Sequence, residues 1–226
     1  MRGWLKFIAA LGITMLLMLM FRALFFTIYI VPNNSLEPLF IRGDRILVNK
    51  WSYGLRTGED IRFGYSRWIK QNIRKGDIAA FNYPIDTLGK VSSNPVYVSC
   101  CVALPGDTVN IGGKLSVVVP GKDVVIDVNK QNAVLLCNML RMHEHRVCYV
   151  CNDELYVEGR KTKRLQFDKD YYWMSNLNTA AFDDSRYFGF VPEDHIIGRV
   201  VMLVYSKDDA RPFYKSLRRG RFFKIL

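Results

Sequence analysis

The chain has 226 residues, half of them hydrophobic, and its 32 basic and 21 acidic side chains give a net charge of +11. This length allows one or two domains, and the apolar content excludes a disordered chain. The positive charge favours anionic lipid over nucleic acid as a partner, because the basic residues are scattered and the N-terminus is apolar.

Residues 1–24 predict a short cytoplasmic stub followed by a transmembrane anchor. Phe7 to Phe21 carries no charge, but this run is shorter than the roughly 20 residues that a spanning helix needs. The span therefore requires Arg22 to reach the headgroups. A cleaved secretory signal also fits the basic start, but the absence of a small-x-small cleavage site favours an uncleaved anchor. The basic leader predicts a cytoplasmic N-terminus and places residues 25–226 outside the cytoplasm.

The remainder of the chain alternates short apolar, β-branched runs with Gly-Asp turns, which predicts a mostly β, antiparallel domain of sandwich or barrel type. A short helix is expected around Tyr65 to Asn72. The tail at 207–226 is basic and aromatic, and it is either a membrane-surface segment or a solvated end. Strands are expected at 25–31, 45–48, 78–83, 96–102, 117–119, 124–128, 146–150, 171–174 and 199–205.

Five cysteines, an odd number, exclude the dense and even pattern of a small disulfide scaffold. At most two pairs can form, so the cysteines do not settle the redox compartment. They are Cys100, Cys101, Cys137, Cys148 and Cys151.

Ser35 lies in the segment Val31-Pro-Asn-Asn-Ser-Leu-Glu-Pro. Pro32 and Pro38 restrict the backbone on both sides, and a serine on a stiff turn is how a nucleophile is presented. The same composition also makes an ordinary polar turn. On these residues alone the plain turn is favoured.

The order of five sequence blocks resembles the bacterial signal peptidase I family. After the anchor come Pro-x-x-Ser-x-x-Pro, Gly-Asp-Arg-Ile-Leu-Val-Asn-Lys at 43–50, Arg-Lys-Gly-Asp-Ile-Ala-Ala-Phe at 74–81, Val-Ala-Leu-Pro-Gly-Asp-Thr-Val at 102–109 and Asp-Ser-Arg-Tyr-Phe-Gly-Phe-Val-Pro at 184–192. Residues 112–166 match no motif of the family and are interpreted as an insertion. The resemblance implies one N-terminal transmembrane helix followed by an antiparallel, β-rich peptidase domain.

The resemblance also implies an activity. The family consists of serine endopeptidases that work without a cofactor and remove signal peptides from exported precursors at the outer face of the cell membrane. Ser35 matches the nucleophile, and Asn33 with Ser35 matches the oxyanion hole, since an amide can donate a hydrogen bond to a developing oxyanion. Leu36 matches an apolar substrate-binding position expected to touch lipid. Asp184 and Arg186 match a pair that supports the site.

The general base departs from the family pattern. The family's lysine lies six residues before Pro-Gly-Asp in a Tyr-x-Lys-Arg motif, and here the stretch is Tyr97-Val-Ser99-Cys100. Ser99 thus occupies the lysine position, and a serine hydroxyl cannot take the proton of another serine near neutral pH. The serine that orients the lysine falls near Ala180 or Ala181. Base and orienting serine are lost together, which predicts a loss of rate on the order of 100- to 10000-fold.

No substitute base is evident. Nothing in the sequence places Lys75 or Lys90 beside Ser35, and the histidines do not match the base of ER-type relatives; these are His143, His145 and His195. We expect His195 on the surface, after Pro-Glu-Asp.

His143-Glu-His145-x-x-Cys148-x-x-Cys151 holds four metal-ligand types with a zinc-like cysteine spacing. Zinc sites usually draw pairs of ligands from two separate turns, whereas these four lie within nine residues. Strand alternation would separate the two cysteines, so residues without metal are favoured. A Cys148–Cys151 disulfide stays open.

Two functions follow from the resemblance. One is an active, membrane-anchored signal peptidase. The other is a catalytically impaired pseudopeptidase that binds signal peptides or a partner peptidase, such as an intact paralogue. The five blocks disfavour a third possibility, an unrelated membrane-anchored β domain. The expected partners are exported precursors and membrane lipid, with no nucleic acid.

Overall fold

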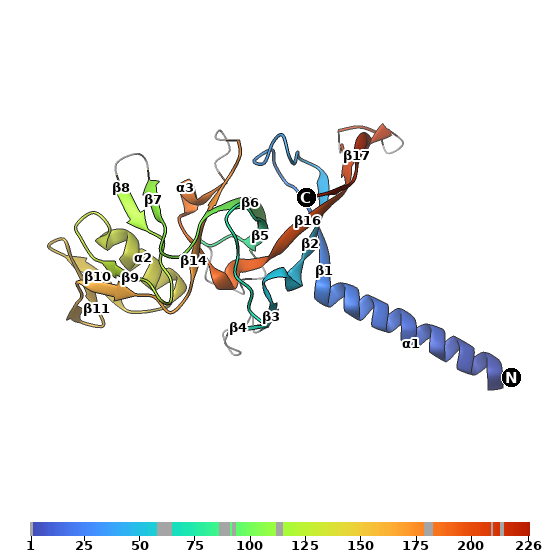
Figure 1. Ribbon diagram of the computed structural model, residues 1–226, viewed down its shortest axis with the longest axis horizontal. Coiled ribbons are helices and arrows are strands. Elements are labelled where there is room, and N and C mark those ends of the chain that lie inside the picture. The colour runs from blue at the N-terminus through green and yellow to red at the C-terminus, as the bar shows by residue number, and fades with distance from the viewer. Residues whose placement is uncertain are drawn as a thin grey trace.

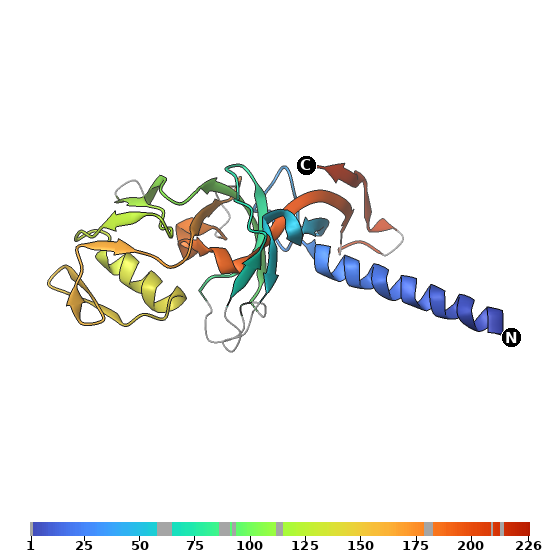
Figure 2. The same ribbon diagram turned by 60° about the horizontal axis from the view of Figure 1, so that its bottom comes forward.

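The computed structural model describes residues 2–57, 65–85, 91, 94–111, 115–178, 183–208, 210–212 and 215–226. The molecule is an elongated β domain from which one N-terminal helix projects (Figures 1 and 2). The helices are α1 (Arg2–Phe25), α2 (Ala133–His143) and α3 (Ser185–Phe188), with 3-10 turns η1 (Lys50–Tyr53) and η3 (Glu193–His195).

Helix α1 extends away from the β domain, and its apolar side chains are exposed on all sides. Its last turn contacts the domain through Phe25, whose ring stacks on Trp51 with centroids 4.9 Å apart. The helix runs through Phe25, so the strand expected to start there begins one residue later. Within the residues that the structure describes, no helix is both long enough and apolar enough to cross a membrane.

An eight-stranded antiparallel sheet forms the body of the domain, in the order β1-β2-β16-β5-β6-β14-β15, with β17 also paired to β16. The expected mostly β, antiparallel domain is therefore confirmed. In β2, burial alternates along the strand, so Ile46 and Val48 enter the core while their neighbours are half exposed. The strands are β1 (Phe26–Ile30), β2 (Asp44–Asn49), β5 (Ile78–Asn82), β6 (Val96–Ala103), β14 (Tyr171–Ser175), β15 (Val191–Pro192), β16 (Ile196–Lys207) and β17 (Leu217–Ile225).

Strand β16 holds the sheet together because it pairs with β2 on one side and with β5 and then β17 on the other. Irregularities in its register let one long strand turn from one partner to the next. A Cβ at Gly198 would lie 2.3 Å from the Asn49 carbonyl oxygen, so only glycine allows the two strands this approach. Strand β17 was not predicted, and it places nine residues of the basic tail in the main sheet.

Smaller sheets complete the domain. Around residues 55–68, β3 (Leu55–Thr57) pairs with β4 (Ser66–Trp68), so the helix expected at Tyr65 to Asn72 is wrong. The side chains of β4 alternate in exposure, as strand residues do. The other small strands are β7 (Thr108–Ile111) with β8 (Leu115–Val118), β9 (Val125–Asp127) with β13 (Arg164–Gln166), and β10 (Cys148–Cys151), β11 (Glu154–Val157) and β12 (Arg160–Lys161).

The described residues of the 112–166 region carry their own hydrophobic core. Helix α2 buries positions spaced by three and four residues, including Leu136 and Leu140, against β10 and β11. The same cluster contains Phe167 and Tyr171, which joins this region to β14 of the main sheet. Figure 1 places it at the end of the molecule opposite α1.

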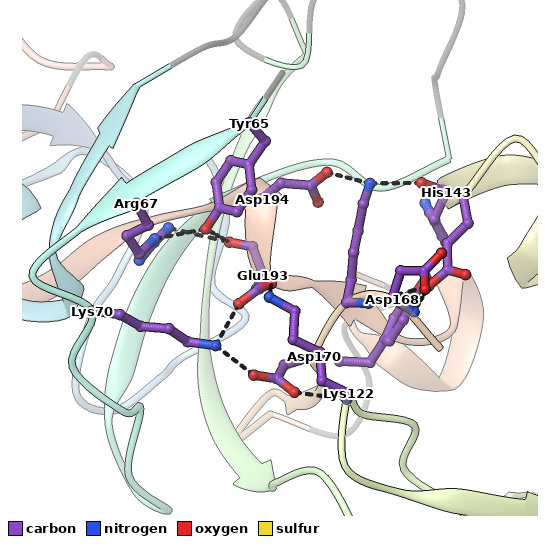
Figure 3. Close-up of polar contacts among 12 residues, drawn as sticks. Tyr65, Arg67, Lys70, Lys122, His143, Asp168, Asp170, Glu193 and Asp194 are labelled. Atoms are coloured by element: carbon purple, nitrogen blue, oxygen red, sulfur yellow. Dashed lines mark hydrogen bonds and ion pairs between the residues drawn. The ribbon is translucent and has the colours of Figure 1, made fainter. Parts of the chain in front are cut away.

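Ion pairs reinforce this junction. Figure 3 shows Lys70 between two carboxylates, with its Nζ 2.6 Å from Asp170 Oδ2 and 2.8 Å from Glu193 Oε2. Lys169 Nζ donates to Asp194 Oδ2 and to the His143 carbonyl oxygen, both at 2.6 Å. Because Glu193 and Asp194 belong to η3, these contacts tie the α2 region to the start of β16.

Candidate active site

Ser35 lies in the turn that joins β1 to β2. Its backbone N–H donates to Asn33 Oδ1 at 3.2 Å, the local side-chain-to-backbone contact that asparagine favours in turns. Its carbonyl oxygen accepts the N–H of Asn178 at 3.0 Å, which joins this turn to the chain after β14. Ser35 is 3% exposed, so the turn is held within the domain.

A continuous hydrogen-bonded path leads from this turn to Ser99. Asn33 Nδ2 donates to Asp183 Oδ2. The Asp183 carbonyl oxygen accepts Asn176 Nδ2 at 3.0 Å. The Ser99 hydroxyl in turn donates to Asn176 Oδ1 at 2.7 Å. These contacts connect the turn that carries Ser35 to Ser99, which is far from it in the sequence.

Strand register explains why Asn176 reaches Ser99. In the antiparallel pairing of β6 with β14, Cys100 lies opposite Ser175, so the next residue of the outgoing chain comes beside Ser99. Ser99 itself lies opposite Ala79 of β5 and is completely buried.

The turn after this strand is fixed by Asp184. Its carboxylate accepts the Asn176 N–H at 3.1 Å and caps α3 by accepting the Arg186 N–H at 3.0 Å. Arg186 Nε donates to both carboxylate oxygens at 2.9 Å, and the carboxylate is fully buried. The Asp184–Arg186 pair therefore positions the segment that carries Asp183 and, through Asp183, Asn33.

Asp183 also affects Tyr97, two residues before Ser99 on β6. Burial first, and then the negative charge of Asp183, raise the pKa of the Tyr97 phenol. The phenol therefore stays neutral near pH 7, as a hydroxyl that can donate or accept a hydrogen bond.

Leu36 does not lie where it was expected. It is completely buried and packs with Val31, Phe40 and Ile46 in the core beneath β2. Contact with lipid at Leu36 is therefore wrong for this structure, because the turn directs this side chain inward. Leu39, three residues later, is 37% exposed instead.

Among the described residues, the hydrogen-bond partner of the Ser99 hydroxyl is Asn176 and not a lysine. Lys75 pairs with Asp107 at 2.8 Å, and Lys90, Ala180 and Ala181 lie outside the described residues. In the part of the chain that the structure describes, no lysine, histidine or carboxylate forms a hydrogen bond with the Ser35 hydroxyl.

The expected surface position of His195 is wrong. Its ring is 3% exposed, Nδ1 lies 3.0 Å from Asp194 Oδ1, and the ring meets His143 edge-on with centroids 5.8 Å apart. Burial, and then the nearby His195, lower the pKa of His143 to about 3. Figure 3 shows His143 and Asp194 within the network that joins α2 to η3.

The four residues of the possible metal motif separate in the structure. His143 and Cys148 are buried, whereas His145 and Cys151 are exposed. Over the described residues, no three histidine, cysteine or acidic side chains gather as a metal site. Cys148 approaches Cys137 rather than Cys151, because Cys148 and Cys151 lie on opposite faces of β10.

Sequence analysis missed Asp183 as a member of this site. It directly precedes Asp184, but its contact with Asn33 spans 150 residues of sequence and has no local signal. Sequence analysis also assigned no role in the site to Asn176 and Asn178. The structure gives both a contact, with Ser99 and with the Ser35 turn.

Comparison with known proteins agrees with the block order. The family model described as signal peptidase, peptidase S26, matches residues 4–205. Signal peptidase I of Buchnera aphidicola subsp. Baizongia pistaciae is 26% identical over 220 residues, covering 76% of this chain and 67% of that protein. Probable signal peptidase I-2 of Synechocystis sp. is 27% identical, covering 75% and 58%. Signal peptidase I of Aquifex aeolicus is 26% identical, covering 89% and 84%. The chain belongs to the signal peptidase I family.

Proposed function

We propose that this chain acts on the signal peptides of exported precursors as a serine endopeptidase of the signal peptidase type. The observation that carries this proposal is the hydrogen-bonded path that joins the Ser35 turn, through Asn33, Asp183 and Asn176, to the position of the family's base. Ser35 would attack the scissile carbonyl. The second amide hydrogen of Asn33 is the candidate donor to the oxyanion, and the Ser35 N–H could join it only after releasing Asn33 Oδ1.

The proposed reaction needs a group that accepts the proton of the Ser35 hydroxyl. A general base must accept it within hydrogen-bond reach, and Ser99 has only a neutral hydroxyl that already donates to Asn176. This contact favours a second candidate function. In that case the chain is an impaired relative that binds signal peptides, or an intact partner peptidase, and hydrolyses them slowly or not at all.

We further propose that α1 attaches the domain to the cell membrane, with the N-terminus cytoplasmic and the β domain outside. A helix whose apolar side chains are exposed along its length is unfavourable in water. The two basic residues near its start, Arg2 and Lys6, favour the cytoplasmic side for the N-terminus.

Cleavage of a model precursor by the full chain in detergent micelles tests the function. Wild type, Ser35→Ala and Ser99→Lys are compared, and binding of an uncleavable signal peptide is measured in parallel. Cleavage by wild type that Ser35→Ala abolishes supports the peptidase. Binding without cleavage supports the impaired relative. Neither binding nor cleavage, in wild type and in Ser99→Lys, would overturn both candidates.

A further inference from the structure

Two cysteines of the 112–166 region lie unusually close together. Cys137 is on the buried face of α2, and Cys148 is the first residue of β10. Their sulfur atoms are 2.7 Å apart, and Cys148 Sγ is 3.0 Å from the Cys137 carbonyl oxygen. Non-bonded heavy atoms in packed cores meet at about 4 Å. The two thiols therefore need only a small movement to reach bonding distance, about 2.05 Å.

No other pair of cysteines has this arrangement. Cys148 and Cys151 stand at the two ends of β10, where strand alternation directs them to opposite faces, and Cys151 is exposed. Cys100 and Cys101 are neighbours on β6 and point to opposite faces of the strand. Neither belongs to the hydrophobic cluster that contains Cys137 and Cys148. The five cysteines thus resolve into one close pair and three single thiols.

We propose that Cys137 and Cys148 form a disulfide bond that fastens helix α2 to the β10–β11 hairpin. Each thiol loses its proton, the two sulfurs join, and two electrons pass to a disulfide oxidant. That oxidant is a small-molecule disulfide such as oxidised glutathione or a protein dithiol–disulfide carrier. It reacts by thiol–disulfide exchange through a mixed disulfide and leaves as two thiols.

Burial determines when this bond forms. Desolvation, followed by the hydrogen bond with Cys137, raises the pKa of the Cys148 thiol to about 12, so its reactive thiolate is scarce in the folded domain. Cys137 is 4% exposed and Cys148 is 6% exposed, which also restricts the approach of an oxidant. Oxidation is therefore fast while the chain folds and slow afterwards. Once formed, the bond is shielded from reductants for the same reason.

The location of the pair defines its role. Both cysteines belong to the hydrophobic cluster with Leu155, Phe167 and Tyr171 that joins this region to β14. Figures 1 and 2 place α2 and β10 at the end of the molecule opposite α1, away from the β1–β2 turn. The bond therefore stabilises the α2 region rather than supplying a group to the Ser35 site.

Thiol mapping of the full chain in detergent tests the proposal. The denatured, reduced protein is refolded in a glutathione redox buffer, denatured again, alkylated with iodoacetamide and digested. We expect a linked peptide pair containing Cys137 and Cys148, and alkylation of the other three cysteines. Five alkylated cysteines, or a bond that includes Cys151, would overturn the proposal. Cys151→Ser should keep the link, and Cys148→Ser should abolish it.

Thermal unfolding tests the stabilising role separately. Wild type refolded in the presence of a reductant should have a Tm roughly 5–10 °C below that of wild type refolded in the glutathione buffer, as expected for a small closed loop in a domain of this size. The Cys137→Ala/Cys148→Ala double variant should show no such response. An equal response in the double variant would overturn the stabilising role. Neither measurement needs precursor cleavage or a membrane, so the result stands whatever the outcome of the peptidase test.

Discussion

The Ser99 hydroxyl, completely buried on β6, donates a hydrogen bond to the side-chain oxygen of Asn176 at 2.7 Å. The family resemblance predicts a basic amine at this position, and here a neutral hydroxyl satisfies a neutral amide. The contact is well suited to holding β6 and the end of β14 together. It is poorly suited to accepting a proton from Ser35.

Restoring the amine should restore the base. In Ser99→Lys, desolvation should lower the pKa of the new ammonium towards neutrality, as it does for buried lysines. We expect precursor cleavage to increase by about 100-fold or more over wild type. The rate should rise with pH through an apparent pKa below the usual lysine value of about 10.4. A pH–rate profile of precursor cleavage measures both.

Ser99→Met controls for the added volume. Methionine fills a comparable space without an amine, and overpacking alone costs about 1–3 kcal/mol of stability. Its cleavage rate should remain at the wild-type level. An equal gain in rate for methionine and lysine would contradict a role for the amine.

Asp183 should act on catalysis through Asn33. In Asp183→Ala, the Asn33 amide loses the carboxylate that accepts from Nδ2, so the oxyanion donor is less well oriented. We expect kcat in the Ser99→Lys background to fall about tenfold with little change in KM. Removing an oxyanion donor typically lowers kcat by about 100- to 1000-fold, and we expect Asn33→Ala to lower kcat by a similar factor. Steady-state kinetics separate kcat from KM.

Asp123→Ala removes a carboxylate from an exposed turn and should leave both constants unchanged. If Asp183→Ala instead raises KM with kcat unaffected, Asp183 contributes to binding and not to the orientation of Asn33.

The main sheet could be predicted because its strands carry local signals. Residues 45–48 and 171–174 are apolar runs bounded by turns, and they lie within β2 and β14. The placement of Ser99 at the family's lysine position stays a prediction, which rests on its fixed spacing to Pro105 within one family block. These features depend on neighbouring residues alone.

Other features depend on contacts across the fold and could not be predicted in this way. Helix α2 is short, and its buried stripe becomes meaningful only once β10 and β11 cover it. The strand character of 217–225 requires β16 as its partner. His195 follows three polar or turn-forming residues, yet it is buried because α2 and His143 pack over η3.

The stability of the protein should depend on the buried side chains of helix α2. Leu136 is completely buried in the cluster with Tyr171, and Leu136→Ala should lower the free energy of unfolding by about 2–5 kcal/mol. Val134, on the same helix, is 57% exposed, and Val134→Ala should change stability by less than about 0.5 kcal/mol. Denaturant unfolding in detergent measures both. A comparable loss in the two variants would contradict the packing of α2 against this core.

Acid should destabilise the junction between α2 and η3 through His143. Its pKa is lowered from 6.5 to about 3 in the folded state, first by burial and then by His195. Between these values the unfolded chain binds a proton that the folded chain does not. Stability is therefore full above pH 6.5 and decreases as the pH falls, by up to about 1.4 kcal/mol per pH unit.

Unfolding measured between pH 7 and 5 covers the range in which His143 acts, and the variants below separate it from Glu144, whose pKa burial raises. Hydrogen bonding and the charges of His195 and Lys169 outweigh burial and hold the pKa of Asp194 well below its usual range. Its own contribution is therefore lost only below about pH 4. His143→Phe keeps a ring against Tyr171 but cannot titrate. It should therefore reduce the slope of the free energy of unfolding against pH between pH 7 and 5. His145→Asn, at an exposed position with positive φ that asparagine tolerates, should retain it. A slope in His143→Phe as steep as in wild type would assign the acid sensitivity to another group.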